Sequence, residues 1–343
     1  MTSLPDSRIP DPIDAPAIRW GVLAPGGIAR SWASALHATT ASRVVAVGSR
    51  SLERAQAFAS EFGGGRAYGD YESLVADPEV DAIYVASPHS HHHEHALLAL
   101  DAGKPILVEK AFTRSAPEAT AVVEAARSRG LLVVEAMWTR FLPHIDVVRR
   151  SLEDGLLGEI VAVEADHGQL LHPHGPQRLA DPALAGGALL DLGIYPVSFA
   201  HFVLGGFSTV RAAGTLAETG VDASETIAVT SPSGAIGTLS ATMLGKTPTS
   251  ASIAGTAGRI FVDHTFYRPT TTVRLFDNTE REIDRYEPPR RDHGLAYEAA
   301  EFARLLTDGK TESDLLPLDE TVRIMQVLDD VRRQLGVRFP GED

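Results

Sequence analysis

Short apolar runs alternate with amphipathic stretches between residues 18 and 142 of the chain. This pattern predicts buried strands at residues 19–23, 43–47, 82–86, 106–108 and 131–134. It predicts helices between them, at residues 28–38, 52–62, 93–101 and 117–128. The predicted strands are apolar throughout rather than alternating, which is typical of a parallel sheet covered by helices on both faces. We therefore expect an α/β domain here.

After Pro143 this alternation of strands and helices stops. A helix is predicted over residues 145–154, a Gly-, Pro- and His-rich loop over 167–187, and a further helical stretch ending near Gly205. Strands are predicted at residues 160–166, 210–215, 226–230, 236–241, 252–255, 259–262 and 272–276. Two amphipathic helices, 295–308 and 318–336, close the chain. Runs of strands without intervening helices predict an antiparallel or mixed sheet in an α+β domain.

The length of 343 residues suggests two domains at roughly 150 residues each. The change of pattern places their boundary between residues 142 and 143, giving domains 18–142 and 143–343. Residues 1–17 are rich in Pro and Asp and lack an apolar run. We expect them to form an extended or disordered arm rather than a signal peptide.

Composition excludes several classes of function. The formal net charge of −14 makes nucleic acids and anionic membrane surfaces poor partners. The chain has no cysteine, so it has no disulfide, thiolate metal site or Cys nucleophile. No run of about 18 uninterrupted apolar residues predicts a membrane span. We expect a cytoplasmic globular protein.

A glycine turn lies between the first predicted strand and the first predicted helix. Gly26, Gly27 and Ile28 stand where backbone N–H groups and a helix N-terminus would approach a pyrophosphate. Ala24 occupies the first glycine position of the usual dinucleotide fingerprint. A plain strand–helix turn is the alternative, but the surrounding alternation of strands and helices favours cofactor binding.

The second predicted strand ends in Gly48-Ser49-Arg50, with Arg54 one helical turn further on. An NAD site commonly has an acidic residue here that binds the ribose 2′-hydroxyl. A guanidinium suits a 2′-phosphate instead, because it can donate paired hydrogen bonds. An exposed arginine without a ligand is the alternative. Ser49, Arg50 and Arg54 therefore favour NADP over NAD.

Histidines are concentrated after the third predicted strand, in the segment Ser87-Pro88-His89-Ser90-His91-His92-His93-Glu94-His95. Imidazoles bind zinc well, but a helix beginning here puts only pairs such as His91 and His95 on one face. Two ligands do not make a metal site, so we expect no metal. Ser87, Pro88, His89 and His92 more plausibly flank a dinucleotide at the carboxyl end of the sheet.

Three further residues carry candidate chemistry. Glu109 and Lys110 follow a buried strand, where a lysine is costly to bury without a role. Asp191 and Tyr195 are four residues apart and would point the same way on a helix, although Gly193 and Pro196 favour a kink there. The alternatives are a solvated lysine, a capping aspartate and a tyrosine packed in the core.

Several of these blocks occur together and in order, and together they resemble the Gfo/Idh/MocA oxidoreductase family over residues 18–337. The matching stretches are Ala86–His92, Gly103–Lys110, Glu135–Pro143, Gly187–Val197 and Gly294–Glu298. The resemblance implies an N-terminal Rossmann domain and a C-terminal α+β domain with a large, mostly antiparallel open sheet. In relatives that sheet's open face commonly joins subunits, so we expect a homodimer or a dimer of dimers.

The resemblance also implies roles for single residues. Lys110 falls on the family's catalytic lysine, Tyr195 on its acid/base tyrosine and Asp191 on a supporting carboxylate. Trp138 and Arg140 look like residues that line the nicotinamide and substrate pocket. Tyrosine rather than histidine at position 195 is similar to the branch of dimeric dihydrodiol dehydrogenases and NADP-dependent D-xylose dehydrogenases. Ala111 replaces the proline that normally follows the Glu-Lys pair, as Ala24 replaces the first fingerprint glycine.

We therefore predict an NADP- or NAD-dependent dehydrogenase in which Tyr195 exchanges a proton, Lys110 supports it electrostatically and Asp191 orients the substrate or Lys110. The substrate would be a sugar, polyol or dihydrodiol, with an aldose such as D-xylose or D-glucose oxidised at C1 as the preferred interpretation. His172, His174 and Arg178 in the long loop either bind substrate hydroxyls or are solvated. A cofactor-binding regulator without catalysis is the alternative function, and a zinc hydrolase is a third possibility.

Overall fold

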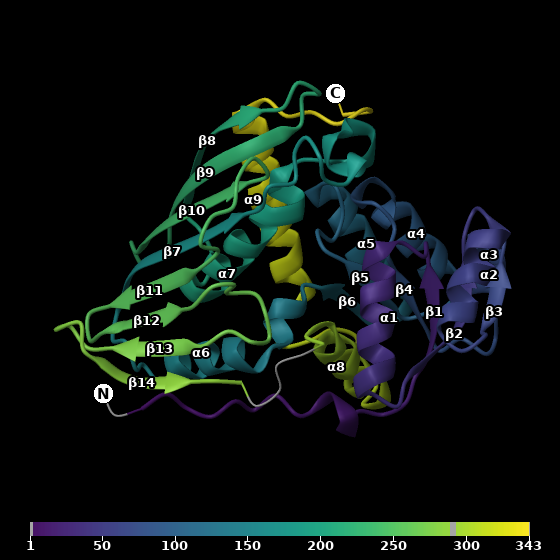
Figure 1. The fold of residues 1–343 in the computed structure, drawn as a ribbon, viewed down its shortest axis with the longest axis horizontal. Helices are drawn as coiled ribbons and strands as arrows, with labels where there is room; N and C mark the ends of the chain where they lie inside the picture. The colour runs from purple at the N-terminus through teal and green to yellow at the C-terminus, as the bar shows by residue number, and fades with distance from the viewer. Residues whose placement is uncertain (1–2, 289–292, 343) are drawn as a thin grey trace. The chain divides into compact units, whose positions relative to one another are not determined.

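The computed structural model describes residues 3–288 and 293–342. These residues form two compact units. The parallel-sheet unit comprises residues 10–141 and 293–322, and the mixed-sheet unit comprises residues 1–9, 142–292 and 323–343 within the described range. Each unit has its own sheet (Figure 1), and the predicted combination of a parallel and a mostly antiparallel sheet is confirmed.

The parallel-sheet unit is built on six strands in the order β3-β2-β1-β4-β5-β6, all paired in parallel. Their bounds are β1 Arg19–Leu23, β2 Arg43–Gly48, β3 Arg66–Tyr68, β4 Ala82–Val85, β5 Ile106–Glu109 and β6 Val133–Ala136. This order is that of the Rossmann fold, and it reverses between β1 and β4. Short β3 was not predicted, because Arg-Ala-Tyr has no apolar run.

Helices cover this sheet on both faces. They are α1 Gly27–Thr39, α2 Leu52–Glu61, α3 Tyr71–Val75, α4 His89–Asp101, α5 Ala116–Arg129 and α8 Leu295–Thr307, with 3-10 turns at Pro12–Asp14 and Trp138–Phe141. Helix α4 packs on α5, and α1 packs on α8. Trp20 of β1 contacts Trp32 and Phe302 at centroid distances of 5.0 and 4.8 Å. This aromatic contact joins β1, α1 and α8 in one core.

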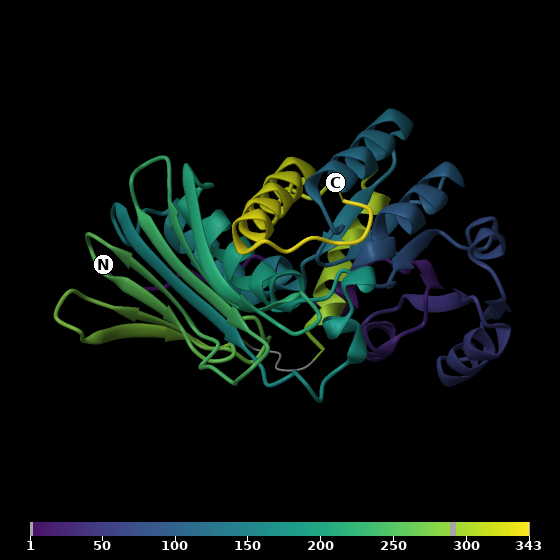
Figure 2. The same cartoon turned by 90° about the horizontal axis from the view of Figure 1, so that it is seen from above.

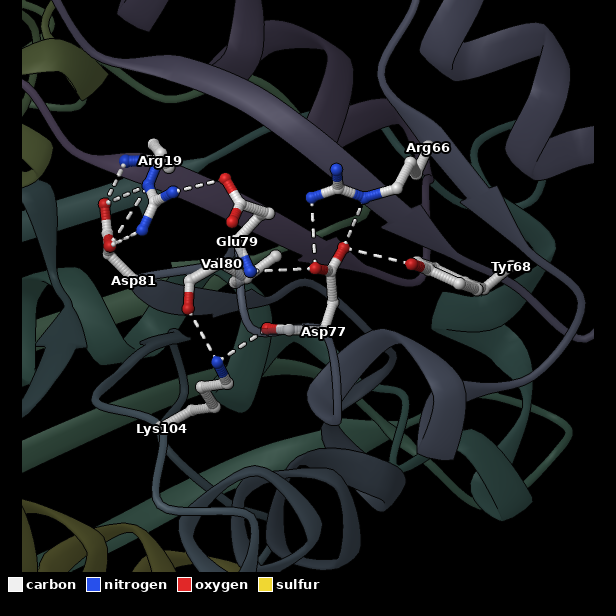
Figure 3. A network of polar contacts seen from close by, with 8 residues as sticks. All are labelled: Arg19, Arg66, Tyr68, Asp77, Glu79, Val80, Asp81 and Lys104. Atoms are coloured by element: carbon white, nitrogen blue, oxygen red, sulfur yellow. Dashed lines mark hydrogen bonds and ion pairs between the residues drawn. The ribbon is translucent and has the colours of Figure 1, made fainter.

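A polar network closes the amino-terminal side of β1 and β4 (Figure 3). Asp77 accepts hydrogen bonds from Arg66 Nε over 2.6 Å and from the Tyr68 hydroxyl over 3.0 Å. Lys104 Nζ donates to the Asp77 and Val80 carbonyl oxygens, each over 2.7 Å. These bonds tie the loop before β4 to β3 and to the turn before β5.

The mixed-sheet unit has eight strands in the order β14-β13-β12-β11-β7-β10-β9-β8. Their bounds are β7 Ile160–Gly168, β8 Thr209–Leu216, β9 Asp222–Thr230, β10 Ile236–Thr242, β11 Ala251–Gly255, β12 Arg259–Val262, β13 Val273–Phe276 and β14 Glu282–Tyr286. Only the β7–β10 pair is parallel among these described strands. Strand β14 was not predicted, because Glu-Ile-Asp-Arg-Tyr is mostly charged.

Helices α6 (Pro143–Glu153) and α7 (Ile194–Leu204) lie against one face of this sheet (Figure 2). Single 3-10 turns at Gln177–Ala180 and Pro182–Leu184 lie in the preceding loop. One π-helical turn, Leu189–Gly193, leads directly into α7. The kink expected from Gly193 and Pro196 is therefore a π turn continuous with α7.

One helical stretch, Pro182–Leu204, is long and apolar enough to cross a membrane by length and composition. The sequence analysis did not predict a membrane span here, because Asp191 and several glycines interrupt the run of apolar residues. In the structure 94% of its most apolar window is buried. A core helix of a globular protein passes the same test.

The N- and C-terminal segments of the chain are shared between the two units in a way that the predicted domain boundaries did not include. Helix α8, predicted to belong to the C-terminal domain, lies in the parallel-sheet unit because it packs on α1 and on the turns at residues 12–14 and 138–141. The final helix α9, Leu318–Leu335, begins within the sequence range of one unit and ends within that of the other. Residues 3–9 are also held, since Arg8 forms an ion pair with Asp146 over 2.9 Å.

Candidate functional site

The glycine turn lies at the carboxyl end of β1 and opens α1. Ala24 has a φ of +70°, so it adopts the left-handed conformation that the first fingerprint glycine normally supplies. Gly26 is the N-cap of α1, with no side chain capping the helix, and Gly27 is its first residue. A Cβ built on either glycine meets nothing within 4 Å, so the space over the helix N-terminus is open. Ile28, which follows, is 39% exposed.

Ser49, Arg50 and Arg54 lie at the end of β2 and the start of α2. Ser49 is buried and accepts a hydrogen bond from the Ser51 amide over 3.2 Å, whereas both arginines are exposed. Arg50 and Arg54 also lie near the Tyr71 hydroxyl. Burial raises the pKa of Tyr71 above its ordinary value, and the charges of the two arginines oppose that shift. The arginines are therefore available to an anion at this edge of the sheet.

The histidine segment forms the turn after β4 and the first turns of α4. Pro88 is the N-cap of α4, and His89 is its first residue and is buried. His92 is fully buried, with Nε2 2.7 Å from the Ser87 carbonyl oxygen and Nδ1 2.9 Å from the Ala111 carbonyl oxygen. Burial lowers the pKa of His92 to about 4, so the ring is neutral near pH 7 and donates to one of the two carbonyls. His92 thus ties the end of β4 to the segment after Lys110.

His95 and Tyr71 lie beside the predicted cofactor-binding residues, although the sequence analysis did not include them among the site residues. His95 Nδ1 lies 2.9 Å from Ser87 Oγ, and its ring packs edge-on against Tyr71 at 4.6 Å. Burial lowers the pKa of His95 to about 4. Among the described residues no group of three or more His, Asp or Glu side chains is arranged to hold a metal ion.

Glu109 and Lys110 mark the end of β5. Glu109 is buried and accepts a hydrogen bond from the Tyr84 hydroxyl of β4. Lys110 is partly exposed, and Ala111 after it is fully buried. The Ala111 carbonyl oxygen lies 2.9 Å from His92 Nδ1.

Trp138 and Arg140 lie in the 3-10 turn after β6. Trp138 is partly exposed, but the Arg140 side chain is 2% exposed and forms an ion pair with Glu320 of α9. Glu135 of β6 adds negative charge to this buried group, and burial raises the pKa of Glu135 to about 7. The Arg140 guanidinium is therefore enclosed in a buried ion pair.

In the mixed-sheet unit, Asp191 lies on the π turn. Its Oδ1 accepts a hydrogen bond from Arg178 over 2.9 Å. The Asp191 side chain is 12% exposed and the Arg178 side chain 41%. Arg178 thus holds the carboxylate of Asp191 through one of its N–H donors. His172 and His174 lie in the same loop without a described site contact.

Tyr195 is in the first turn of α7 and is 8% exposed. Its ring packs against Tyr267 at 4.6 Å and edge-on against His167 at 5.1 Å. His167 Nδ1 lies 3.1 Å from the Leu192 carbonyl oxygen, and Gln169 Nε2 lies 2.9 Å from His167 Nε2. His167 therefore donates from Nδ1 and accepts at Nε2.

His167 and Tyr267 were not predicted as site residues. His167 ends a strand and could have been suspected from its place before the long loop. Tyr267 lies in a segment between β12 and β13 that carries no pattern of its own, so only the fold brings it to Tyr195.

The parallel-sheet unit fits a dinucleotide. The carboxyl ends of β1, β2, β4 and β5 carry the predicted cofactor-binding residues, on both sides of the point where the strand order reverses. The uncapped N-terminus of α1, open above Gly26 and Gly27, suits a pyrophosphate. The predicted Asp191 and Tyr195 lie in the other unit, together with Arg178 and His167.

Comparison with known families agrees with this division. Residues 18–137 match the GFO/IDH/MocA oxidoreductase family with an NAD-binding Rossmann fold, and residues 145–261 match the GFO/IDH/MocA C-terminal domain. The first match spans the whole parallel sheet, and the second spans β7 to β11 and most of β12 but not β13 or β14.

Individual proteins are similar over nearly the whole chain. The trans-1,2-dihydrobenzene-1,2-diol dehydrogenase of Bos taurus is 36% identical, over 95% of this chain and 99% of that protein. The D-xylose 1-dehydrogenase (NADP(+)) of Hypocrea jecorina is 36% identical, over 94% of this chain and 93% of that protein. The crystal structure of a 3-ketoreductase from Actinomadura kijaniata with NADP and TDP-benzene superimposes with a TM-score of 0.81 at 28% identity, covering 93% of this chain and 98% of that one.

Proposed function

Since the chain belongs to the GFO/IDH/MocA oxidoreductase family, we propose that it transfers a hydride between NADP or NAD and a hydroxyl or carbonyl carbon of a sugar, polyol or dihydrodiol. The observation that carries the proposal is the open, uncapped N-terminus of α1 in a sheet of Rossmann order. Exposed Arg50 and Arg54 beside it favour a 2′-phosphate, and therefore NADP.

A bound nicotinamide supplies or accepts the hydride, and the chain supplies position, charge and a proton. Tyr195 is proposed as the acid/base, because its hydroxyl can exchange the proton of the substrate oxygen as that oxygen changes between alcohol and carbonyl. An ordinary phenol ionises near pH 10, too high for a base at neutral pH. We propose that Lys110 supplies the positive charge that favours the phenolate.

Asp191 is proposed to orient a substrate hydroxyl or Lys110. Its carboxylate is held by Arg178, so one oxygen is fixed while the side chain retains 12% exposure. An anionic acceptor held in one geometry binds hydroxyl groups well. This polar arrangement suits a substrate with several hydroxyl groups, and we propose an aldose such as D-xylose or D-glucose, oxidised at C1.

The direct test measures reduced nicotinamide by its absorbance while the protein is supplied with aldoses, polyols or trans-dihydrodiols. Each substrate class is tested with NADP and NAD separately, and reactions without substrate serve as controls. We expect turnover with an aldose and NADP. Tight NADP binding without turnover of any substrate would favour a cofactor-binding regulator, and zinc retained on purification would favour the hydrolase.

We also propose a homodimer, or a dimer of dimers, through the face of the eight-stranded sheet opposite α6 and α7. Residues on that face are exposed and mostly small or apolar, such as Ala228, Thr238 and the 55% exposed Ile236. A sheet face of small and apolar side chains lets a second copy of the same face approach closely. Light scattering after gel filtration should give twice the 36.6 kDa chain mass or a multiple of it, and Thr238→Arg should reduce it to the monomer.

We propose that the protein acts in the cytoplasm on small molecules, without nucleic acid or membrane partners. The absence of cysteine and the net charge of −14 support this location and this choice of partner. Cell fractionation tests the location, and a DNA-binding measurement at low salt tests the exclusion of nucleic acid.

A further inference from the structure

Two buried carboxyl groups lie under the π turn that carries Asp191, and the proposed chemistry does not use them. Asp222 and Glu225 both belong to β9 and are 1% and 3% exposed. Both carboxyl oxygens of Glu225, and Oδ1 of Asp222, have no hydrogen-bond partner. Buried polar atoms without partners are rare in proteins, so each calls for an explanation.

Asp222 holds the start of the π turn. Its Oδ2 accepts a hydrogen bond from the Leu189 amide over 2.5 Å, and Leu189 is the first residue of that turn. A Cβ on Gly187 would collide with the Asp222 carboxyl group, and Gly187 has a φ of +118°. Only glycine fits at position 187 on both counts.

Glu225 lies against the other end of the turn. A Cβ on Gly193 would lie 2.8 Å from Glu225 Oε1 and 3.0 Å from Leu189 Cδ1. His167 of β7 also holds this end, since its Nδ1 lies 3.1 Å from the Leu192 carbonyl oxygen. The two glycines of the segment Gly187–Gly193 therefore mark the places where the backbone rests on carboxyl groups.

The buried position of Glu225 favours its uncharged form. Burial raises the pKa of Glu225 well above its ordinary value, and the nearby Asp222 raises it further. An uncharged carboxyl group can pack under a helix turn without the cost of burying a charge.

We propose that Glu225 is a positioning residue: packed under Gly193, its buried side chain sets the place of the π turn, and through the turn the direction of Asp191 and Tyr195. Tyr195 follows Gly193 by two residues in continuous helix, so a displacement of Gly193 is passed to the phenol. The inference rests on the proposed role of Tyr195, and it adds a residue that touches neither substrate nor cofactor.

A second-site suppression experiment tests this packing. Gly193→Ala should lower kcat roughly ten- to hundredfold, because a catalytic group displaced by about 1 Å loses its geometry. In the double variant Gly193→Ala/Glu225→Ala the shorter side chain at position 225 leaves room for the added Cβ at position 193. Its kcat should therefore equal that of Glu225→Ala alone. Ile227→Ala, buried on the same face of β9, is the matched control. Because its side chain is not the one that the added Cβ meets, its fold decrease in kcat should multiply with the fold decrease caused by Gly193→Ala.

Two readouts separate positioning from mere stability. Glu225→Gln copies the neutral acid and should restore most of the kcat that Glu225→Leu loses. The affinity for NADPH, followed by fluorescence, should be unchanged in all these variants. The proposal would be overturned if the fold decreases in kcat of Gly193→Ala and Glu225→Ala multiply in the double variant. It would also be overturned if these variants lower the thermal unfolding midpoint and leave kcat unchanged.

The experiment also distinguishes this inference from the proposed function. If the wild-type protein turns over no substrate, the function fails, and the same set of variants is compared by thermal unfolding midpoint. Suppression of the Gly193→Ala loss by Glu225→Ala would still support the packing of Gly193 on Glu225, and its absence would refute it.

Discussion

Arg178 donates a hydrogen bond to Asp191 Oδ1 over 2.9 Å, so the loop before the π turn holds the carboxylate that the turn presents. Arg178→Met removes the donor and keeps the apolar stem. We expect kcat/KM for the sugar to fall about tenfold, since the Asp191 carboxylate loses one of the contacts that fix its orientation. Steady-state kinetics with varied sugar measure the change. Arg333→Met, at an exposed ion pair with Asp330, is the control and should leave kcat/KM unaltered.

Tyr195→Phe removes the proposed proton donor and leaves the aromatic packing with His167 and Tyr267. We expect kcat to fall on the order of 10²–10⁴-fold, the contribution of a positioned acid/base. Binding of NADPH should change little, because the substitution removes a single hydroxyl and none of the residues proposed to hold the cofactor. Stopped-flow single-turnover rates check the chemical step directly. Wild-type turnover in Tyr195→Phe would refute the assigned role.

Arg50→Asp tests the choice between NADP and NAD. An aspartate at the end of β2 repels a 2′-phosphate and can accept a hydrogen bond from a 2′-hydroxyl. We expect the affinity for NADP to fall by a factor of about 100 and that for NAD to stay or rise. Titration of each cofactor by calorimetry measures both changes, with the exposed Arg129→Asp as the control. Equal losses for the two cofactors would contradict the assignment.

Asp77 predicts how stability responds to acid. Burial alone would raise the pKa of Asp77, but hydrogen bonds from the Glu79 amide, Arg66 and Tyr68 outweigh it and hold the pKa below its ordinary value. A depressed folded-state pKa contributes stability above the unfolded pKa, and that contribution is lost as the pH falls through the folded pKa. Asp77→Asn should therefore cost about 2–4 kcal/mol at pH 7 and less as the pH drops below about 4.

Urea unfolding at pH 7 and at pH 3.5 measures this difference. Asp101→Asn removes a carboxylate whose ion pair with Arg129 is exposed, so it should change stability little at either pH. A cost of Asp77→Asn that is the same at both pH values would show that its ionisation does not matter.

Much of the fold was predictable from local pattern. Buried parallel strands such as β1 and β5 are apolar runs, and they were found within a residue or two of their observed ends. The strands that were missed, β3 and β14, are short or charged, so they are strands only because a neighbour pairs with them. Helix α8 was found, but its place beside α1 was not, because packing partners distant in sequence leave no local signal.

The candidate site divides in the same way. Gly26, Lys110 and Tyr195 stand out in sequence because turn geometry or chemistry restricts the residue type. The contacts of Arg178 with Asp191 and of Tyr267 with Tyr195 join residues 13 and 72 positions apart in the chain, and no motif connects them.

The amino-acid sequence alone determined most of the strands and helices, the glycine turn and the residue types able to move a proton, because each follows from the conformational and chemical preferences of a few neighbouring residues. Tertiary structure alone decided that Arg140 is enclosed in an ion pair, that Asp191 is held by Arg178, and that Gly193 rests on the buried Glu225. Those outcomes depend on which side chains meet when the sheet forms, and burial then sets their charge.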